Sequence, residues 1–120
     1  MLSLSKLIIF TTALASYASA TTYAQFCNNG DCTEGCGISV SVDNPGCLNE
    51  NGRVAIKFHD TNLGAINLVT SPGPDCPCQN YCYSNIVEPI KGGTEGCFPL
   101  TGPDAQSFRF QTEVCPENNC

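Results

Sequence analysis

The chain has 120 residues, of which 11 are acidic and five are basic, and its formal net charge is −6. A nucleic-acid binder or a lytic cationic peptide needs clustered Lys and Arg to engage phosphate groups, and the sequence contains no such cluster. Electrostatic docking to anionic lipid headgroups is disfavoured for the same reason. We therefore expect no nucleic acid among the partners of this protein.

The first 20 residues have the pattern of a secretory signal peptide. Lys6 precedes an apolar run over residues 7–14, and three small residues follow at 18–20, where signal peptidase cleaves. The apolar run is too short to remain as a permanent membrane anchor. We therefore expect residues 1–20 to be removed, and residues 21–120 to form a single secreted, extracellular domain without stable membrane insertion.

All ten cysteines follow this leader: Cys27, Cys32, Cys36, Cys47, Cys76, Cys78, Cys82, Cys97, Cys115 and Cys120. An exported chain this rich in cysteine is typical of a disulfide scaffold, and the even number predicts five bridges and no free thiol. The connectivity stays open, because ten cysteines allow about 945 pairings. Since a native bridge in a small secreted domain typically contributes about 2–5 kcal/mol, we expect the fold to depend on oxidation.

Short runs of alternating apolar and polar residues recur along the chain. In chain order they are residues 23–27, 38–42, 54–58, 66–68 and 108–111, with turn signals at 43–46, 51–52, 62–64 and 101–104. Such alternation predicts half-buried antiparallel strands, and the density of Gly and Pro leaves room only for short elements. Asn51-Gly52 can close a hairpin, because both residues accept positive φ. We expect a mainly β fold, a small disulfide-rich antiparallel β-sandwich or barrel.

One segment departs from this pattern. Asp75 can cap a helix, with Pro77 in the first turn, where a missing N–H has no cost. Three apolar side chains then share one face of that helix, at positions 78, 82 and 86. The alternative is a strand with Tyr81 and Tyr83 on one face. We favour one short helix over residues 76–86.

The same segment carries the densest cysteine cluster, Cys76-Pro77-Cys78 followed by Cys82. Thiolates at this spacing can hold a metal ion. However, thiols of exported proteins oxidise, and no His lies in the cluster. Cys76 and Cys78 are too close to bond to each other without strain. We therefore expect disulfides to distant partners, pinning this segment to two strands, and we expect no metal and no cofactor.

His59 and Asp60 form the one His-Asp pair of the chain. A His beside an Asp, with Ca²⁺ and a bound water, is the chemistry of secreted phospholipases A2. Those enzymes carry the pair on a long helix flanked by disulfides, whereas here it ends a strand-like run. We favour a strand-end histidine followed by a turn aspartate. Because His59 is the sole imidazole, a Ser or Cys nucleophile has no other base, and we expect no enzyme.

Two further groups can bind ligands but have simpler structural explanations. The loop between Cys27 and Cys36 carries three side chains with oxygen ligands suited to Ca²⁺, namely Asn28, Asp31 and Glu34. We favour a plain disulfide knuckle with solvated acids. Tyr81 and Tyr83 can stack on sugar rings, but single aromatic side chains usually pack in a core, and we favour packing.

A signal peptide, an acidic mature domain of about 100 residues, ten cysteines and a terminal Cys120 together resemble the small cysteine-rich secreted proteins of filamentous fungi. The resemblance covers the whole chain and is one of composition. It implies an effector-like virulence protein that binds a host extracellular protein or a cell-wall glycan as a monomer, without catalysis. The alternatives are a secreted toxin or antimicrobial protein acting on competing microbes, and a small secreted hydrolase using His59 and Asp60.

Overall fold

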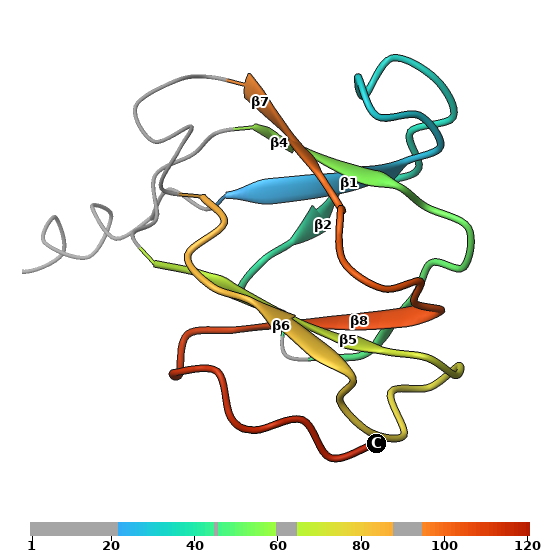
Figure 1. The fold of residues 1–120 in the computed structure, drawn as a ribbon. Coiled ribbons are helices and arrows are strands. Elements are labelled where there is room, and N and C mark those ends of the chain that lie inside the picture. Colours follow the sequence, from blue (N-terminus) through green and yellow to red (C-terminus); the bar gives the residue numbers. More distant parts are fainter. Residues whose placement is uncertain (1–21, 45, 60–64, 88–94) are drawn as a thin grey trace, which may run out of the picture.

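The computed structural model describes residues 22–44, 46–59, 65–87 and 95–120, and in these ranges the chain forms eight strands and no helix. The strands are β1 (Tyr23–Cys27), β2 (Val40–Ser41), β3 (Leu48–Asn49), β4 (Ala55–His59), β5 (Asn67–Ser71), β6 (Tyr81–Tyr83), β7 (Glu95–Pro99) and β8 (Ser107–Gln111). They form two antiparallel sheets, sheet A in the order β2-β1-β4-β7 and sheet B in the order β3-β8-β5-β6. Figure 1 shows the two sheets as stacked layers. The prediction of a mainly β, disulfide-rich antiparallel fold is confirmed.

The core lies between the two sheets and is built from alternate residues of their central strands. Phe26 on β1 packs against Phe108 on β8, with ring centroids 5.0 Å apart. Phe58 on β4 meets Phe110 on β8 edge to face at 6.3 Å. These rings and their aliphatic neighbours are almost completely buried, so the alternating pattern of β4 and β8 places their apolar faces toward each other.

The chain crosses repeatedly from one sheet to the other, and one of these crossings lies at Asn51-Gly52, where the sequence predicts a hairpin. Asn51 and Gly52 do form a turn, in which Gly52 has a φ of +88° and the Arg53 N–H donates to the Glu50 carbonyl. However, β3 belongs to sheet B and β4 to sheet A. The turn therefore carries the chain between layers, and the hairpin prediction is wrong.

The predicted strand over residues 38–42 is shorter in the structure. Only Val40 and Ser41 pair with β1. Val42 is buried, whereas Ile38 is 80% exposed, so the three branched side chains do not share a buried face. The backbone before Val40 is held differently, because the Gly37 N–H donates to the Phe26 carbonyl.

The predicted helix over residues 76–86 is wrong, and the alternative strand is correct. Asp75 and Cys76, at the intended helix start, have left-handed φ angles of 67° and 53°. Beyond them β6 pairs with β5, and Tyr81 and Tyr83 lie on one face of that strand. Tertiary constraints thus override a local helix signal. In the described part of the chain, no helix is long and apolar enough to cross a membrane.

Candidate binding site

The ten cysteines, all in the described ranges, form five disulfides and leave no free thiol. The pairs are Cys27–Cys36, Cys32–Cys97, Cys47–Cys76, Cys78–Cys120 and Cys82–Cys115. Two of them fix residues 27–37, which we call the knuckle, on the outer face of sheet A. Two others fix residues 112–120, the tail, beside sheet B. Figure 1 shows the tail running below the lower layer to the C-terminus.

The knuckle is closed by side-chain hydrogen bonds as well as by its disulfides. The Asn29 Oδ1 accepts the backbone N–H groups of Thr33 and Glu34, each at 2.9 Å. Such an Asn replaces a backbone turn and fixes the loop locally. Underneath, Cys27 and Ala55 form a small buried cluster separate from the main core. The knuckle is therefore an ordered cap on sheet A.

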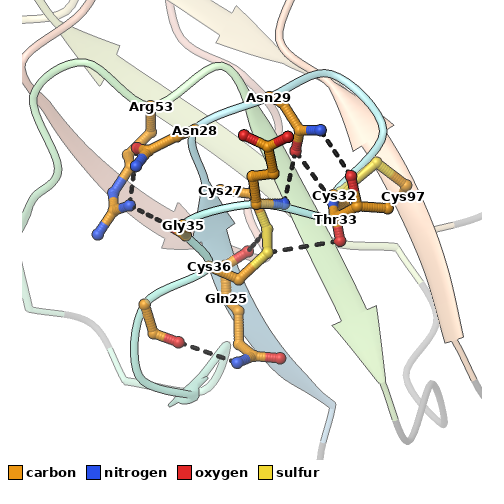
Figure 2. Close-up of a disulfide and its surroundings, with 12 residues drawn as sticks. Gln25, Cys27, Asn28, Asn29, Cys32, Thr33, Gly35, Cys36, Arg53 and Cys97 are labelled. Carbon is orange, nitrogen blue, oxygen red and sulfur yellow. Dashed lines mark hydrogen bonds between the residues drawn. A yellow bond between two sulfur atoms is a disulfide. The ribbon is translucent and has the colours of Figure 1, made fainter.

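Arg53 clamps the knuckle to the turn that follows β3. Its Nε donates to the Glu50 carboxylate at 2.8 Å. Its Nη1 donates to the Asn28 Oδ1 at 2.9 Å and to the Gly35 carbonyl oxygen, as Figure 2 shows. One guanidinium thus joins two loops whose residues lie far apart in sequence. Sequence reasoning did not single out Arg53, since nothing local marks its long-range partners.

The three side chains considered as calcium ligands have other surroundings in the structure. The Asn28 side-chain oxygen accepts a hydrogen bond from the Arg53 guanidinium. Asp31 and Glu34 are solvent-exposed. Within the described ranges, no group of three or more His, Cys, Asp or Glu side chains is placed to hold a metal ion. The loop has the disulfide knuckle that the sequence analysis favoured.

The sulfurs of the Cys76-x-Cys78 cluster are bonded to partners far away in sequence. Cys76 joins Cys47, and the other two cysteines of the cluster join the tail. Distant disulfide partners are what the sequence analysis predicted. The expectation that these bonds pin the segment to two strands is wrong, because Cys47 lies just before β3 and the tail contains no strand.

Gln79 holds the tail where its disulfides attach. The Gln79 backbone N–H donates to the Asn119 Oδ1 at 2.7 Å, and the Asn119 N–H donates back to the Gln79 carbonyl at 2.9 Å. The Gln79 side-chain Nε2 donates to the Pro116 carbonyl at 2.8 Å. Gln79 is 5% exposed, and these bonds satisfy its backbone N–H, its backbone carbonyl and its side-chain nitrogen. These hydrogen bonds take the place of strand pairing, which the irregular tail does not form.

His59 lies at the end of β4, as the sequence analysis favoured. Its Nε2 is 3.0 Å from the Ser39 Oγ, and the Tyr23 ring stacks on it at a centroid distance of 5.6 Å. Asp60 lies outside the described residues, so the His59-Asp60 pair stays a prediction. Ser39 was not singled out by sequence reasoning, because it lies 20 residues away from His59.

A pocket of about 320 Å³ opens where residues 50–54 meet residues 100–105 at one end of the sandwich. Both connections lie at the right-hand side in Figure 1. Apolar lining comes from Val54, Leu100, Pro103, Ala105 and Phe108, and polar lining from Asn51, Asp104 and Tyr83. The clamped Arg53 belongs to the same wall. Pockets with an apolar wall and few convergent polar groups are the usual small-molecule sites of proteins.

Tyr83 and Tyr81 have different roles beside this pocket. Tyr83 is 8% exposed, and its ring meets Phe98 edge to face at 5.8 Å. Its hydroxyl oxygen accepts the Gly102 N–H at 2.7 Å, and burial raises the pKa of this phenol. Tyr81 packs its edge against Tyr83 at 4.7 Å and remains 38% exposed. Packing thus accounts for Tyr83, and of these two residues Tyr81 is the one that offers aromatic surface to solvent.

Gly102 is required by this arrangement. A Cβ at this position would lie 2.8 Å from the Tyr83 hydroxyl oxygen and 3.1 Å from two ring carbons of Tyr81. Contacts that short force a shift of the rings or of the loop. The glycine therefore lets the loop after β7 approach both tyrosines, and the Gly-Pro-Asp turn signal is the one trace of this in the sequence.

Comparison with known proteins gives no match: no family model fits the chain, and no curated protein and no solved structure is significantly similar to it.

Proposed function

We propose that the chain is a secreted, effector-like binding protein that engages a host extracellular protein or a cell-wall glycan without catalysis. The observation that carries this proposal is the pocket between residues 50–54 and 100–105, whose wall is fixed by the Arg53 clamp. Binding loops that are ordered in advance lose less entropy when a ligand binds. Five disulfides in so small a chain fit an extracellular protein.

The disulfide framework supports binding over a purely structural role. It orders the knuckle and the tail, which have almost no regular hydrogen-bonded structure of their own. Through Arg53 the knuckle in turn positions the turn at residues 51–53, which lines the pocket. Function in such folds commonly resides in loops on a rigid scaffold.

Filling the pocket tests the proposal. Val54 lines the pocket and is 41% exposed, so Val54→Trp should fill the space without disturbing the core. Val114→Trp on the tail, where the side chain is 86% exposed, is the matched control. The oxidised protein and both variants are immobilised and exposed to host extracellular fluid and to isolated wall material. We expect Val54→Trp alone to lose binding; if it binds as the parent does, the pocket is not the site.

Biological assays then separate an effector from a toxin. Leaf infiltration of the oxidised protein reports an effect on a host, and growth assays on fungi and bacteria report an effect on competing microbes. An effect in leaves that Val54→Trp abolishes supports the effector role. An effect confined to microbial growth favours the toxin or antimicrobial alternative.

A small secreted hydrolase is the second candidate, and the Ser39–His59 contact of 3.0 Å favours it. A serine hydroxyl beside an imidazole can be activated as a nucleophile. An activated serine is labelled by a fluorophosphonate probe. Covalent labelling at Ser39 that His59→Ala abolishes would support the hydrolase. A protein that stays unlabelled, or whose labelling survives His59→Ala, would contradict it.

A further inference from the structure

The size of the pocket limits its ligand. Its volume of about 320 Å³ is at the lower end of small-molecule sites, which span about 300–1,000 Å³. The space suits one or two rings of a ligand or a single side chain. It opens to solvent at its rim, where Pro103 and Asp104 are exposed. A longer ligand can therefore place one unit inside and continue outward.

The hydrogen-bonding groups of the pocket suit hydroxyl groups. The Tyr83 oxygen accepts the Gly102 N–H, so the phenol proton is not used in that bond and can be donated to a ligand. The raised pKa of Tyr83 keeps this proton in place at neutral pH. Asn51 and Asp104 add an exposed amide and an exposed carboxylate. Together they offer donors and acceptors, which a hydroxyl needs because it both donates and accepts.

The remaining lining suits the C–H faces of a sugar ring. Val54 is 41% exposed and lies beside the half-buried Leu100 and Ala105. Tyr81 extends this apolar surface at the rim, where its ring lies against Gly102. An aromatic ring with one exposed part provides a large, rigid contact area.

The charges disfavour an anionic ligand. The guanidinium in the pocket wall, that of Arg53, already binds Glu50, Asn28 and Gly35. The Asp104 carboxylate lies at the rim, and the chain carries a net charge of −6. The long-range field of the protein therefore repels polyanions and leaves neutral ligands unaffected.

From these observations we infer that the pocket binds a neutral oligosaccharide, with one sugar ring against Val54 and Tyr83 and the next ring over Tyr81. This inference rests on the proposed function, since it names the ligand class of the same pocket. Asp104 and Asn51 bind hydroxyls of the inner ring. Tyr81 supplies the contact that distinguishes an oligomer from a monosaccharide.

The test is a titration of the ¹⁵N-labelled oxidised protein with four hexamers, and with glucose for comparison, followed by amide chemical shifts. Cellohexaose and hexa-N-acetylchitohexaose are the neutral probes, hexagalacturonate is the anionic probe and hexalysine is the cationic probe. We expect a neutral probe to shift the backbone amides of residues 51–54, 81–83, 100–102 and 104–105, and the charged probes to leave them unmoved. Glucose should bind more weakly than cellohexaose, because it cannot reach Tyr81.

Two matched pairs of variants localise the contacts. Tyr83→Phe keeps the ring and removes the hydroxyl, and we expect about a tenfold loss of affinity for the neutral probe. Tyr81→Ala should cause a similar loss for the hexamer and none for glucose. Tyr23→Phe and Tyr23→Ala are the controls, because Tyr23 is 36% exposed and Tyr81 is 38% exposed, and Tyr23 lies on the outer face of sheet A. The controls should bind as the parent does.

The outcomes separate the ligand class from the site. Shifts in the pocket caused by hexagalacturonate or hexalysine alone overturn the neutral-sugar inference and leave the pocket as the binding site. If no probe causes a shift but Val54→Trp still abolishes binding of a host protein, the neutral-sugar inference is likewise overturned and the pocket remains the binding site. Shifts by a neutral probe that lie outside residues 51–54, 81–83 and 100–105 also overturn the inference. If Val54→Trp retains all binding, the proposed function itself fails.

Discussion

The knuckle and the tail cover the outer faces of the two sheets with the same number of disulfides, yet they are held in different ways. The Cys27–Cys36 bond closes a local loop with a sequence separation of 9. The Cys78–Cys120 bond joins residues with a sequence separation of 42. The knuckle adds the Asn29 turn and the Arg53 clamp, whereas the tail is bonded by two buried residues of sheet B and its loops, Gln79 and Asn67.

This difference shows how the two disulfide types contribute. A bond that closes a long loop removes more conformational entropy from the unfolded chain than a bond that closes a short one. The Cys32–Cys97 bond of the knuckle, with a sequence separation of 65, and the two tail bonds, at 42 and 33, are therefore expected to carry more of the global stability than the Cys27–Cys36 bond. The short knuckle bond mainly shapes a loop that side-chain hydrogen bonds already order. Within the knuckle, global stability and loop shape are thus assigned to different bridges, the long Cys32–Cys97 bond and the short Cys27–Cys36 bond.

Reduction of all five disulfides has the largest expected effect on stability, because it releases the knuckle and the tail together. Each bridge contributes about 2–5 kcal/mol, while the whole free energy of unfolding of a small domain is about 5–15 kcal/mol. We expect the oxidised protein to resist protease and heat, and the reduced, alkylated protein to be digested and inactive in the leaf or growth assay. Protease digestion with and without reductant measures this. A reduced protein that stays resistant and active would mean that a linear motif carries the function.

Removing one bridge from each region sharpens the comparison. From loop length alone, Cys78→Ala with Cys120→Ala should lower the free energy of unfolding by about 4 kcal/mol, and Cys27→Ala with Cys36→Ala by about 2.5 kcal/mol. Urea unfolding of the two double variants measures both values. If the knuckle variant is the less stable of the two, packing of the buried Cys27 outweighs loop length, and the comparison is reversed.

The fold was predictable wherever one strand carries a complete alternation. Residues 54–58 and 108–111 alternate cleanly, and β4 and β8 occupy nearly the same positions. β7 was missed because Gly96 and Pro99 interrupt its pattern, and β3 because it has two residues. The helix prediction failed because the local signal at Asp75 competes with disulfides to distant segments.

The candidate site was predictable only in part, because its contacts join segments that are distant in sequence. Tyr81 and Tyr83 were singled out as aromatic residues, but the hydrogen bond of the Tyr83 hydroxyl comes from Gly102, 19 residues later in the chain. Arg53 reaches Asn28 across 25 residues. Such pairings are tertiary, and no local spacing encodes them. Disulfide connectivity belongs to the same class, since the cysteine count leaves about 945 pairings open.

Breaking the arginine clamp tests whether the knuckle depends on it. Arg53→Met keeps much of the side-chain length and removes the hydrogen bonds to Asn28, Gly35 and Glu50. We expect the free energy of unfolding to fall by about 1–3 kcal/mol, because the partners lose a charged donor. Hydrogen exchange of the knuckle amides should also become faster. Arg109→Met on β8 is the control and should leave knuckle exchange unchanged; equal effects of both variants would contradict the clamp.

The smallest expected effect is the contribution of Tyr83 to the pH dependence of stability. Burial raises the pKa of Tyr83 above its usual value, the neighbouring Tyr81 raises it further, and the hydrogen bond from Gly102 opposes both. The folded state therefore holds the phenol proton more tightly than the unfolded state. The contribution to stability is complete below the unfolded pKa of about 10, and it is lost as the pH rises through the folded pKa.

Comparing two conservative variants isolates this contribution. Tyr83→Phe should be less stable than the parent at neutral pH, because it loses the Gly102 hydrogen bond, and its stability should fall less between about pH 9 and pH 11. Tyr23→Phe is the control for removal of a tyrosine hydroxyl elsewhere. Thermal unfolding across this pH range measures both. If the parent and Tyr83→Phe lose stability in parallel above pH 9, then ionisation of Tyr83 does not contribute to the loss of stability at high pH. The Tyr83 hydroxyl would then be more accessible to water than its burial indicates.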